Sequence, residues 1–90
     1  MNTEMQLPDL FTNLTECEIK VLWCVIQGIT NKEISKQLFI SVGTVKFHLS
    51  SLYKKTKTKT RTELTQKVLL FLINKPLNFE MFFHLFYNNY

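Results

Sequence analysis

A chain of 90 residues, with 46% hydrophobic and 20% charged residues, has the composition of one folded domain, which excludes a disordered protein. The net charge of +4 is unevenly spread: residues 32–67 hold nine Lys or Arg and two Glu, a balance of +7, whereas residues 1–31 hold one Lys and four acids, a balance of −3. A basic segment of this kind favours a polyanionic partner such as nucleic acid, because neutralising phosphates releases their counterions.

The N-terminal part of the chain predicts an arm followed by a helix. Residues 1–13 are expected to form the arm. The helix should begin after Thr15, because the side chains of Thr15 and Glu18 can satisfy each other's backbone N–H groups in a capping box. It should end at Gly28, since glycine accepts the left-handed conformation that follows many helices. Trp23 falls on the polar stripe of this helix, so we expect the arm or the C-terminal segment to cover it.

The middle of the chain predicts two further helices joined by a tight turn. Thr30 with Glu33 makes a second capping box, and Ser41 caps another helix, so helices are expected over about 31–38 and 42–55. Their buried positions should be Ile34, Leu38, Val45, Leu49 and Leu52. This leaves an outer face on the longer helix, formed by Lys46, Phe47, Ser50 and Lys54. Such a helix-turn-helix has the geometry that enters a DNA major groove.

A fourth helix is predicted by a third capping-box pattern, formed by Thr60 and Glu63. The side chains that it should bury are Leu64, Val68, Leu69 and Leu72. Pro76 should end it, because the residue before a proline is pushed out of helical geometry.

The C-terminal segment 76–90 carries an aromatic stripe at helical spacing, with Asn78 as the expected cap. Its members are Phe79, Phe82, Phe83, Phe86, Tyr87 and Tyr90. Six aromatic side chains on one face are costly in water, so they must cover something. We expect them to form a two-fold dimer contact. The alternative is that the segment covers Trp23 and the arm of its own subunit, and that dimerisation rests on the fourth helix alone.

These segments closely resemble the C-terminal DNA-binding domain of the LuxR/NarL/GerE family of bacterial transcription regulators. The matching residues are Leu14-Thr15-Glu16, Gly28, Asn31-Lys32-Glu33-Ile34, Leu38-Phe39-Ile40-Ser41, Thr44-Val45-Lys46, His48 and Arg61-Thr62-Glu63. The resemblance implies an all-α, four-helix domain over residues 14–75, with the helix-turn-helix at about 30–55. Its third helix would read DNA, and its fourth helix often dimerises. Thr56 and Thr58 stand where the family usually has apolar residues, so we expect weaker packing between these two helices.

The candidate DNA contacts divide into two sets. Lys46 can donate to guanine, Phe47 can touch a thymine methyl group, and Ser50 completes the expected base contacts. The residues expected to contact phosphate are Asn31, Lys32, Thr44 and Lys54, of which the first three lie at helix N-termini. Two alternatives stay open: Thr44 can equally bond its own helix backbone, and Lys54 can equally be a solvated charge.

The expected function is sequence-specific regulation of transcription by a homodimer on two-fold related double-stranded DNA. Thirteen residues precede the match, too few for a receiver domain or a small-molecule pocket, so the chain resembles the stand-alone members of the family. RNA polymerase or another regulator is a further candidate partner. Two alternatives are a protein that sequesters a longer homologous regulator and a promoter-recognition module like region 4 of a sigma factor.

Other classes of protein are disfavoured by what the chain lacks. It has no carboxylate pair, Ser/His/Asp set or glycine-rich phosphate loop, so we do not expect an enzyme. Cys17 and Cys24 are too few for a disulfide framework or zinc site, and we expect no metal or cofactor. The start of the chain lacks the pattern of a signal peptide, and no apolar run can span a bilayer. We therefore expect a cytoplasmic, nucleoid-associated protein without membrane contact.

Overall fold

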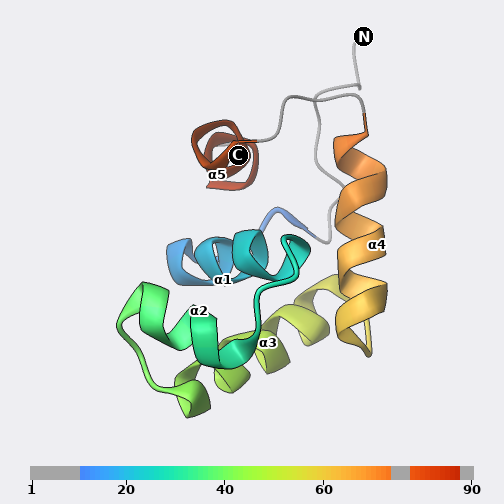
Figure 1. Ribbon diagram of the computed structural model, residues 1–90. Helices are drawn as coiled ribbons and strands as arrows, with labels where there is room; N and C mark the ends of the chain where they lie inside the picture. The colour runs from blue at the N-terminus through green and yellow to red at the C-terminus, as the bar shows by residue number, and fades with distance from the viewer. Residues whose placement is uncertain (1–10, 74–77, 88–90) are drawn as a thin grey trace, which may run out of the picture.

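The computed structural model describes residues 11–73 and 78–87, which contain five α-helices and no strand. The helices are α1 (Glu16–Ile26), α2 (Asn31–Leu38), α3 (Val42–Thr56), α4 (Arg61–Leu72) and α5 (Phe79–Tyr87). α1 lies between α3 and α5, α2 packs beside α3, and α4 stands upright along one side of the domain (Figure 1). The expected all-α fold, a four-helix core with an added C-terminal helix, is confirmed.

α1 begins and ends at the residues that the sequence predicts. Both halves of its capping box are formed: the Glu18 N–H donates to Thr15 Oγ1 (3.1 Å), and the Thr15 N–H donates to Glu18 Oε1 (2.9 Å). Gly28 has a φ of 79°, the left-handed conformation expected just after this helix.

The capping boxes of α2 and α4 are only half formed. Thr30 and Thr60 accept from the N–H groups of Glu33 (3.2 Å) and Glu63 (3.0 Å), as expected. The Glu63 carboxylate, however, accepts from the N–H of Lys59 (2.7 Å), one residue ahead of the cap. Within the described residues, no bond returns from Glu33 to Thr30. The two reciprocal bonds were therefore wrongly expected, although both helices begin as predicted, because one side-chain oxygen is enough to fix the N-cap.

α4 buries three of the four side chains assigned to its inner face. These are Leu64, Val68 and Leu72. Leu69 is 40% exposed, next to Leu70 at 75% and Ile73 at 65%. The expected burial of Leu69 was wrong, because this residue lies about 100° around the helix from the buried row. α4 ends at Leu72, and its expected terminator Pro76 lies outside the described residues.

α5 folds back over its own subunit instead of presenting its aromatic stripe to solvent. Asn78 caps it as expected, with Oδ1 accepting from the Met81 N–H (2.9 Å). Phe82 and Phe86 are each 1% exposed, so they are core side chains with no surface left for a second chain. Their expected role in dimerisation is corrected accordingly, and Tyr90 lies outside the described residues.

The aromatic packing of α5 covers Trp23, which is the alternative that the sequence left open. The Trp23 ring centre lies 5.0 Å from that of Phe82 and 5.8 Å from that of Phe79. Phe86 packs edge-on against Phe11, just before α1, with ring centres 5.7 Å apart. Because its residues meet both α1 and the segment before it, α5 holds these two parts of the chain together.

The junction between α3 and α4 contains two buried hydroxyl groups where apolar side chains were expected. Thr56 Oγ1 donates to the Leu52 carbonyl (2.7 Å) and lies 2.9 Å from Thr58 Oγ1. Since the Thr56 proton is already used, Thr58 must be the donor in the pair. Lys67 of α4 adds a bond to the Thr56 carbonyl (3.0 Å). The hydroxyl groups are thus satisfied locally, and weak packing at this junction was wrongly expected.

A pair of substitutions tests this arrangement. Thr56→Val should lower the free energy of unfolding by about 1–3 kcal/mol, because it leaves the buried Thr58 hydroxyl without an acceptor. The double variant Thr56→Val/Thr58→Val should be more stable than Thr56→Val alone, since both polar partners are then replaced. Urea unfolding measures both, with the exposed Thr62→Val as a control. Additive losses in the double variant would show that the two hydroxyl groups do not bond each other.

Candidate nucleic-acid interface

α3 has one buried face and one exposed face, as the sequence predicts. Val45, Leu49 and Leu52 are at most 5% exposed and pack into the core. The four side chains assigned to the outer face, Lys46, Phe47, Ser50 and Lys54, are all exposed. The structure therefore brings all the expected base contacts onto one surface, and Lys54 lies one turn further along the same helix.

Two of the three phosphate contacts expected at helix N-termini already have partners within the fold. Thr44 Oγ1 lies 2.9 Å from Ser41 Oγ, which also accepts from the Thr44 N–H (3.0 Å). Thr44 thus makes the local bond that was its alternative role. Asn31 Oδ1 accepts from Arg61 Nη1 (2.7 Å), which leaves only its amide N–H groups for a phosphate. Lys32 is exposed in the first turn of α2, where backbone N–H groups also favour an anion.

The nine basic residues of the segment 32–67 divide into two groups. Those that bond within the fold are Lys55, Arg61 and Lys67. The other six are exposed and make no ion pair with any described residue: Lys32, Lys36, Lys46, Lys54, Lys57 and Lys59. Only this second group can attract phosphate at full strength, because a lysine with a carboxylate partner releases no further counterion.

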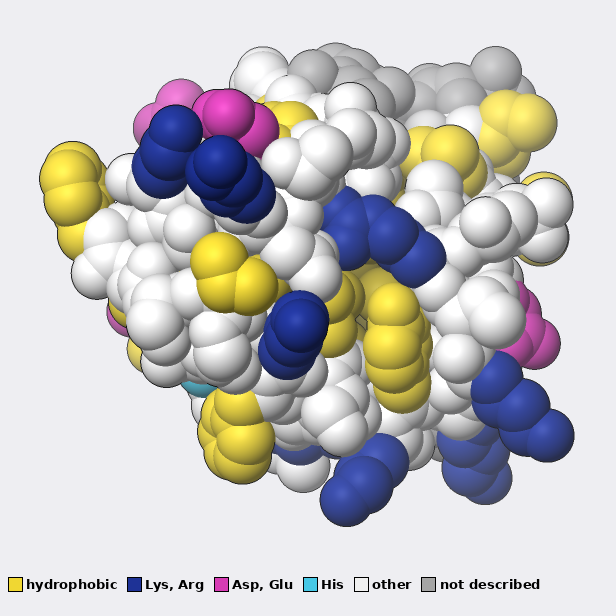
Figure 2. All heavy atoms as spheres, turned by 60° about the horizontal axis from the view of Figure 1, so that its bottom comes forward, with side chains coloured by type: hydrophobic (Ala, Val, Ile, Leu, Met, Phe, Trp, Pro, Cys, Tyr) yellow, Lys and Arg dark blue, Asp and Glu magenta, His cyan; other side chains and the backbone are white. Residues whose placement is uncertain are grey.

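The exposed lysines share their surface with hydrophobic side chains. Figure 2 shows lysine and arginine side chains spread across this face, hydrophobic ones between them, and the acidic side chains in view toward its edges. Phe47 is 68% exposed, and its ring packs edge-on against that of His48, with 5.8 Å between the centres. Phe39 is 93% exposed at the end of α2, with a φ of 58°. The sequence gave no separate signal for Phe39, because it lies in a turn without periodicity.

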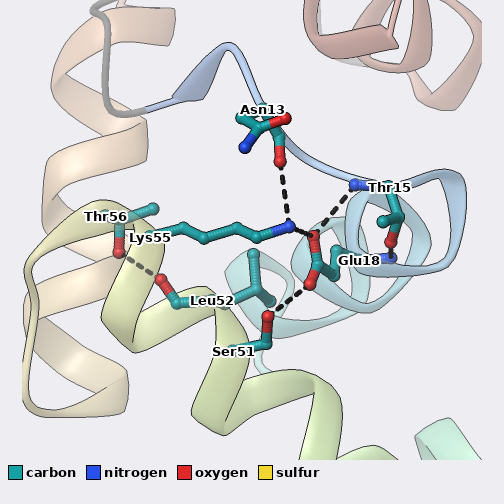
Figure 3. Close-up of polar contacts among 7 residues, drawn as sticks. All are labelled: Asn13, Thr15, Glu18, Ser51, Leu52, Lys55 and Thr56. Atoms are coloured by element: carbon teal, nitrogen blue, oxygen red, sulfur yellow. Dashed lines mark hydrogen bonds and ion pairs between the residues drawn. The ribbon is translucent and has the colours of Figure 1, made fainter.

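A polar network behind α3 connects it to α1 (Figure 3). Glu18 Oε1 accepts from Lys55 Nζ (2.8 Å), and Glu18 Oε2 accepts from Ser51 Oγ (2.5 Å). Lys55 Nζ also donates to the carbonyl of Asn13 (2.9 Å). From the sequence, Glu18 had only a capping role. Its second role has no local signal, since its partners Ser51 and Lys55 lie more than thirty positions further along the chain.

The surroundings of Glu18 keep its carboxyl group charged. Burial raises the pKa of this carboxyl, but the hydrogen bonds from Lys55, Ser51 and the Thr15 backbone lower it by more, so that its pKa lies below the ordinary value of 4.5. A carboxyl group whose pKa is lowered by folding stabilises the fold above its unfolded pKa. That contribution is lost as the pH falls through the folded pKa.

Comparison with known proteins decides the class. The family of bacterial regulatory proteins named luxR matches residues 12–68, which is more than half of the chain and includes α1, α2 and α3 completely. The chain belongs to this family. It is therefore a DNA-binding protein of the transcription-regulator class, and not an enzyme.

Several curated proteins are similar to the same part of the chain. The chain is 42% identical over 60 residues to the transcriptional regulatory protein LnrK of Bacillus subtilis, covering 67% of this chain and 27% of that protein. The same identity over 57 residues, 63% of this chain and 26% of the relative, holds for the nitrate/nitrite response regulator protein NarP of Escherichia coli. The chain thus spans less than a third of the length of these relatives. No solved structure matches it significantly.

A second surface of this luxR-family domain lies on α4. The side chains of Gln66, Leu69, Leu70 and Ile73 line a shallow hollow of about 540 Å³. Two of them, Leu70 and Ile73, are mostly exposed, which is unusual for large apolar side chains lying next to each other. Away from these surfaces, none of the helices in residues 11–73 and 78–87 has the length and hydropathy that a membrane span requires.

Proposed function

We propose that this chain binds double-stranded DNA by inserting α3 into the major groove, and that it regulates transcription from that position as a homodimer. The observation that carries the proposal is the division of α3 into a buried apolar face and an exposed face that bears Lys46, Phe47 and Ser50. A helix anchored in this way can enter the groove as a rigid unit and present side chains to base edges.

Each exposed group has a role that follows from its chemistry. Lys46 donates to acceptors on guanine, Phe47 packs on a thymine methyl group, and Ser50 bonds a base edge. Lys32 and Lys54 contact phosphates on either side of the groove and fix the orientation of α3. Thr44 and Asn31 contribute to phosphate binding through the helix N-termini at which they lie, since their side chains already have internal partners.

The dimer contact is assigned to α4 and not to the aromatic stripe. Phe82 and Phe86 are buried within their own subunit, whereas Leu70 and Ile73 are exposed on a neighbouring surface. Pairing this surface with its copy hides apolar area and creates a two-fold axis. A two-fold dimer places its recognition helices about 34 Å apart, the length of one DNA turn.

The two alternative functions are less well supported. A protein that only sequesters a homologous regulator needs the α4 surface but has no use for six exposed, unpaired lysines. A sigma-factor module is disfavoured because the luxR family model matches residues 12–68.

The first test is DNA binding by the outer face of α3. Duplexes bound by the full chain are selected from a random-sequence pool, and affinity for the enriched site is then measured. Lys46→Ala should cost about 1–3 kcal/mol of binding free energy and relax the preference at one base pair in each half-site. Lys20→Ala on α1, whose side chain pairs with Glu16 (3.3 Å), should leave affinity unchanged. Equal affinities of the native chain and Lys46→Ala would contradict the groove assignment.

The second test separates the two candidate dimer surfaces by sedimentation. The native chain should be dimeric at concentrations of tens of micromolar, and Leu70→Glu should make it monomeric by placing a charge in the apolar contact. Met81→Glu on α5, which is 45% exposed, is the matched control and should remain dimeric. A native monomer, or a dimer that Met81→Glu breaks and Leu70→Glu does not, would contradict the α4 assignment.

A further inference from the structure

We propose that Glu18, Ser51 and Lys55 form a clamp that sets the rotation of α3 about its own axis, and that this clamp determines how well the chain distinguishes its DNA site from other sequences. The inference rests on the proposed function. In it, Glu18 and Lys55 are positioning residues: they touch no DNA, but they hold Lys46 and Phe47 at the angle from which those side chains reach base edges.

The clamp is directional where the rest of the α1–α3 contact is not. Glu18 is 4% exposed, and three donors converge on its carboxylate, two of them from α3. Hydrogen bonds to a charged group are short and depend steeply on angle. Apolar contacts such as those of Leu49 and Leu52 depend mainly on the area that they bury, so they tolerate small rotations of the helix.

The geometry of α3 transmits this restraint to its outer face. Ser51 and Lys55 lie four residues apart and therefore share one side of the helix, the side that faces α1. Ser50 and Lys54, their immediate neighbours in sequence, lie about 100° around the axis, on the exposed face. Because a helix turns as a rigid body, a rotation that stretches the bonds to Glu18 displaces these side chains too. Binding groups lose effectiveness when they deviate by more than about 0.5 Å or 10–20°.

Lys55 is unlike the exposed lysines, although it lies in the same basic segment. Its Nζ donates to both Glu18 and the Asn13 carbonyl, and its side chain is 29% exposed. Its charge is matched inside the fold, so it contributes no counterion release on DNA. This separates a positioning role from a phosphate contact: Lys55 should affect selectivity and not the dependence of affinity on salt.

The clamp also reaches the aromatic helix, which lies beyond the family match. Asn13 belongs to the short segment before α1 whose Phe11 is 1% exposed and packs against Phe86. α5 therefore holds the segment that supplies the second acceptor of Lys55. This gives the intramolecular packing of α5 a consequence for the recognition helix.

The test compares two neighbouring lysines in the full chain. For Lys55→Met and Lys54→Met, affinity is measured for the selected duplex and for a scrambled duplex over a range of salt concentrations. Lys54→Met should weaken both duplexes by the same factor and flatten the salt slope by about 0.9. Lys55→Met should lower the ratio of the two affinities about tenfold, the scale of one impaired base contact, and leave the slope unchanged. An unchanged ratio, or a flattened slope, for Lys55→Met would overturn the clamp.

A second variant removes the effect of simple instability. Lys55→Met leaves a buried, unpaired carboxylate, whereas Glu18→Met/Lys55→Met replaces the ion pair by apolar side chains and should recover the lost stability. If the clamp positions α3, this stable double variant still discriminates poorly. A double variant that is stable and as selective as the native chain would show that the pair is only structural.

Two further readouts separate failure of the clamp from failure of the proposed function. Without DNA, the stability of the native chain relative to the double variant should be constant above about pH 4.5 and fall below it, as Glu18 becomes protonated. A pH-independent difference would overturn the clamp whatever the DNA result. If instead the native chain enriches no sequence from the pool, the proposed function fails, and the clamp's effect on selectivity fails with it.

Discussion

The Glu18 carboxylate lies between α1 and α3, almost completely removed from water, and a charge in that position must have partners. Its partners come from the capping box of α1 and from the inner side of α3, so one side chain both starts the first helix and holds the recognition helix. The apolar cluster supplies most of the burial, but only the polar contacts select one rotation of α3. The outward direction of Lys46 and Phe47 depends on that selection.

Internal pairing also changes how the charge of the chain is to be understood. From composition, the segment 32–67 carries nine basic residues, yet Lys55, Arg61 and Lys67 each bond within the fold. They join α3 to α1, α4 to the start of α2, and α4 to the end of α3, and in this way they fix the relative positions of the helices. The six remaining lysines are the ones that meet phosphate. The basic segment therefore serves two purposes, cohesion of the domain and attraction to DNA, through different residues.

Features with local causes were predictable from the sequence, and features with tertiary causes were not. Thr15, Gly28 and Ser41 fix helix ends through bonds and backbone angles within a few residues, and periodicity gives the two faces of α3. The exposure of Leu69, the bond from Arg61 to Asn31 and the pairing of Glu18 with Lys55 depend on how the helices pack, which periodicity does not contain. The aromatic stripe of α5 showed that something must be covered, but not whether it was a second chain or Trp23.

The most direct measurement of the central claim, that the outer face of α3 meets DNA, is a backbone-amide NMR titration of the full chain with its selected duplex. The account predicts that the largest shift changes fall in residues 44–54 and in the first turn of α2, whereas residues 79–87 stay nearly unchanged. Changes concentrated in α4 or α5, with α3 unaffected, would contradict it.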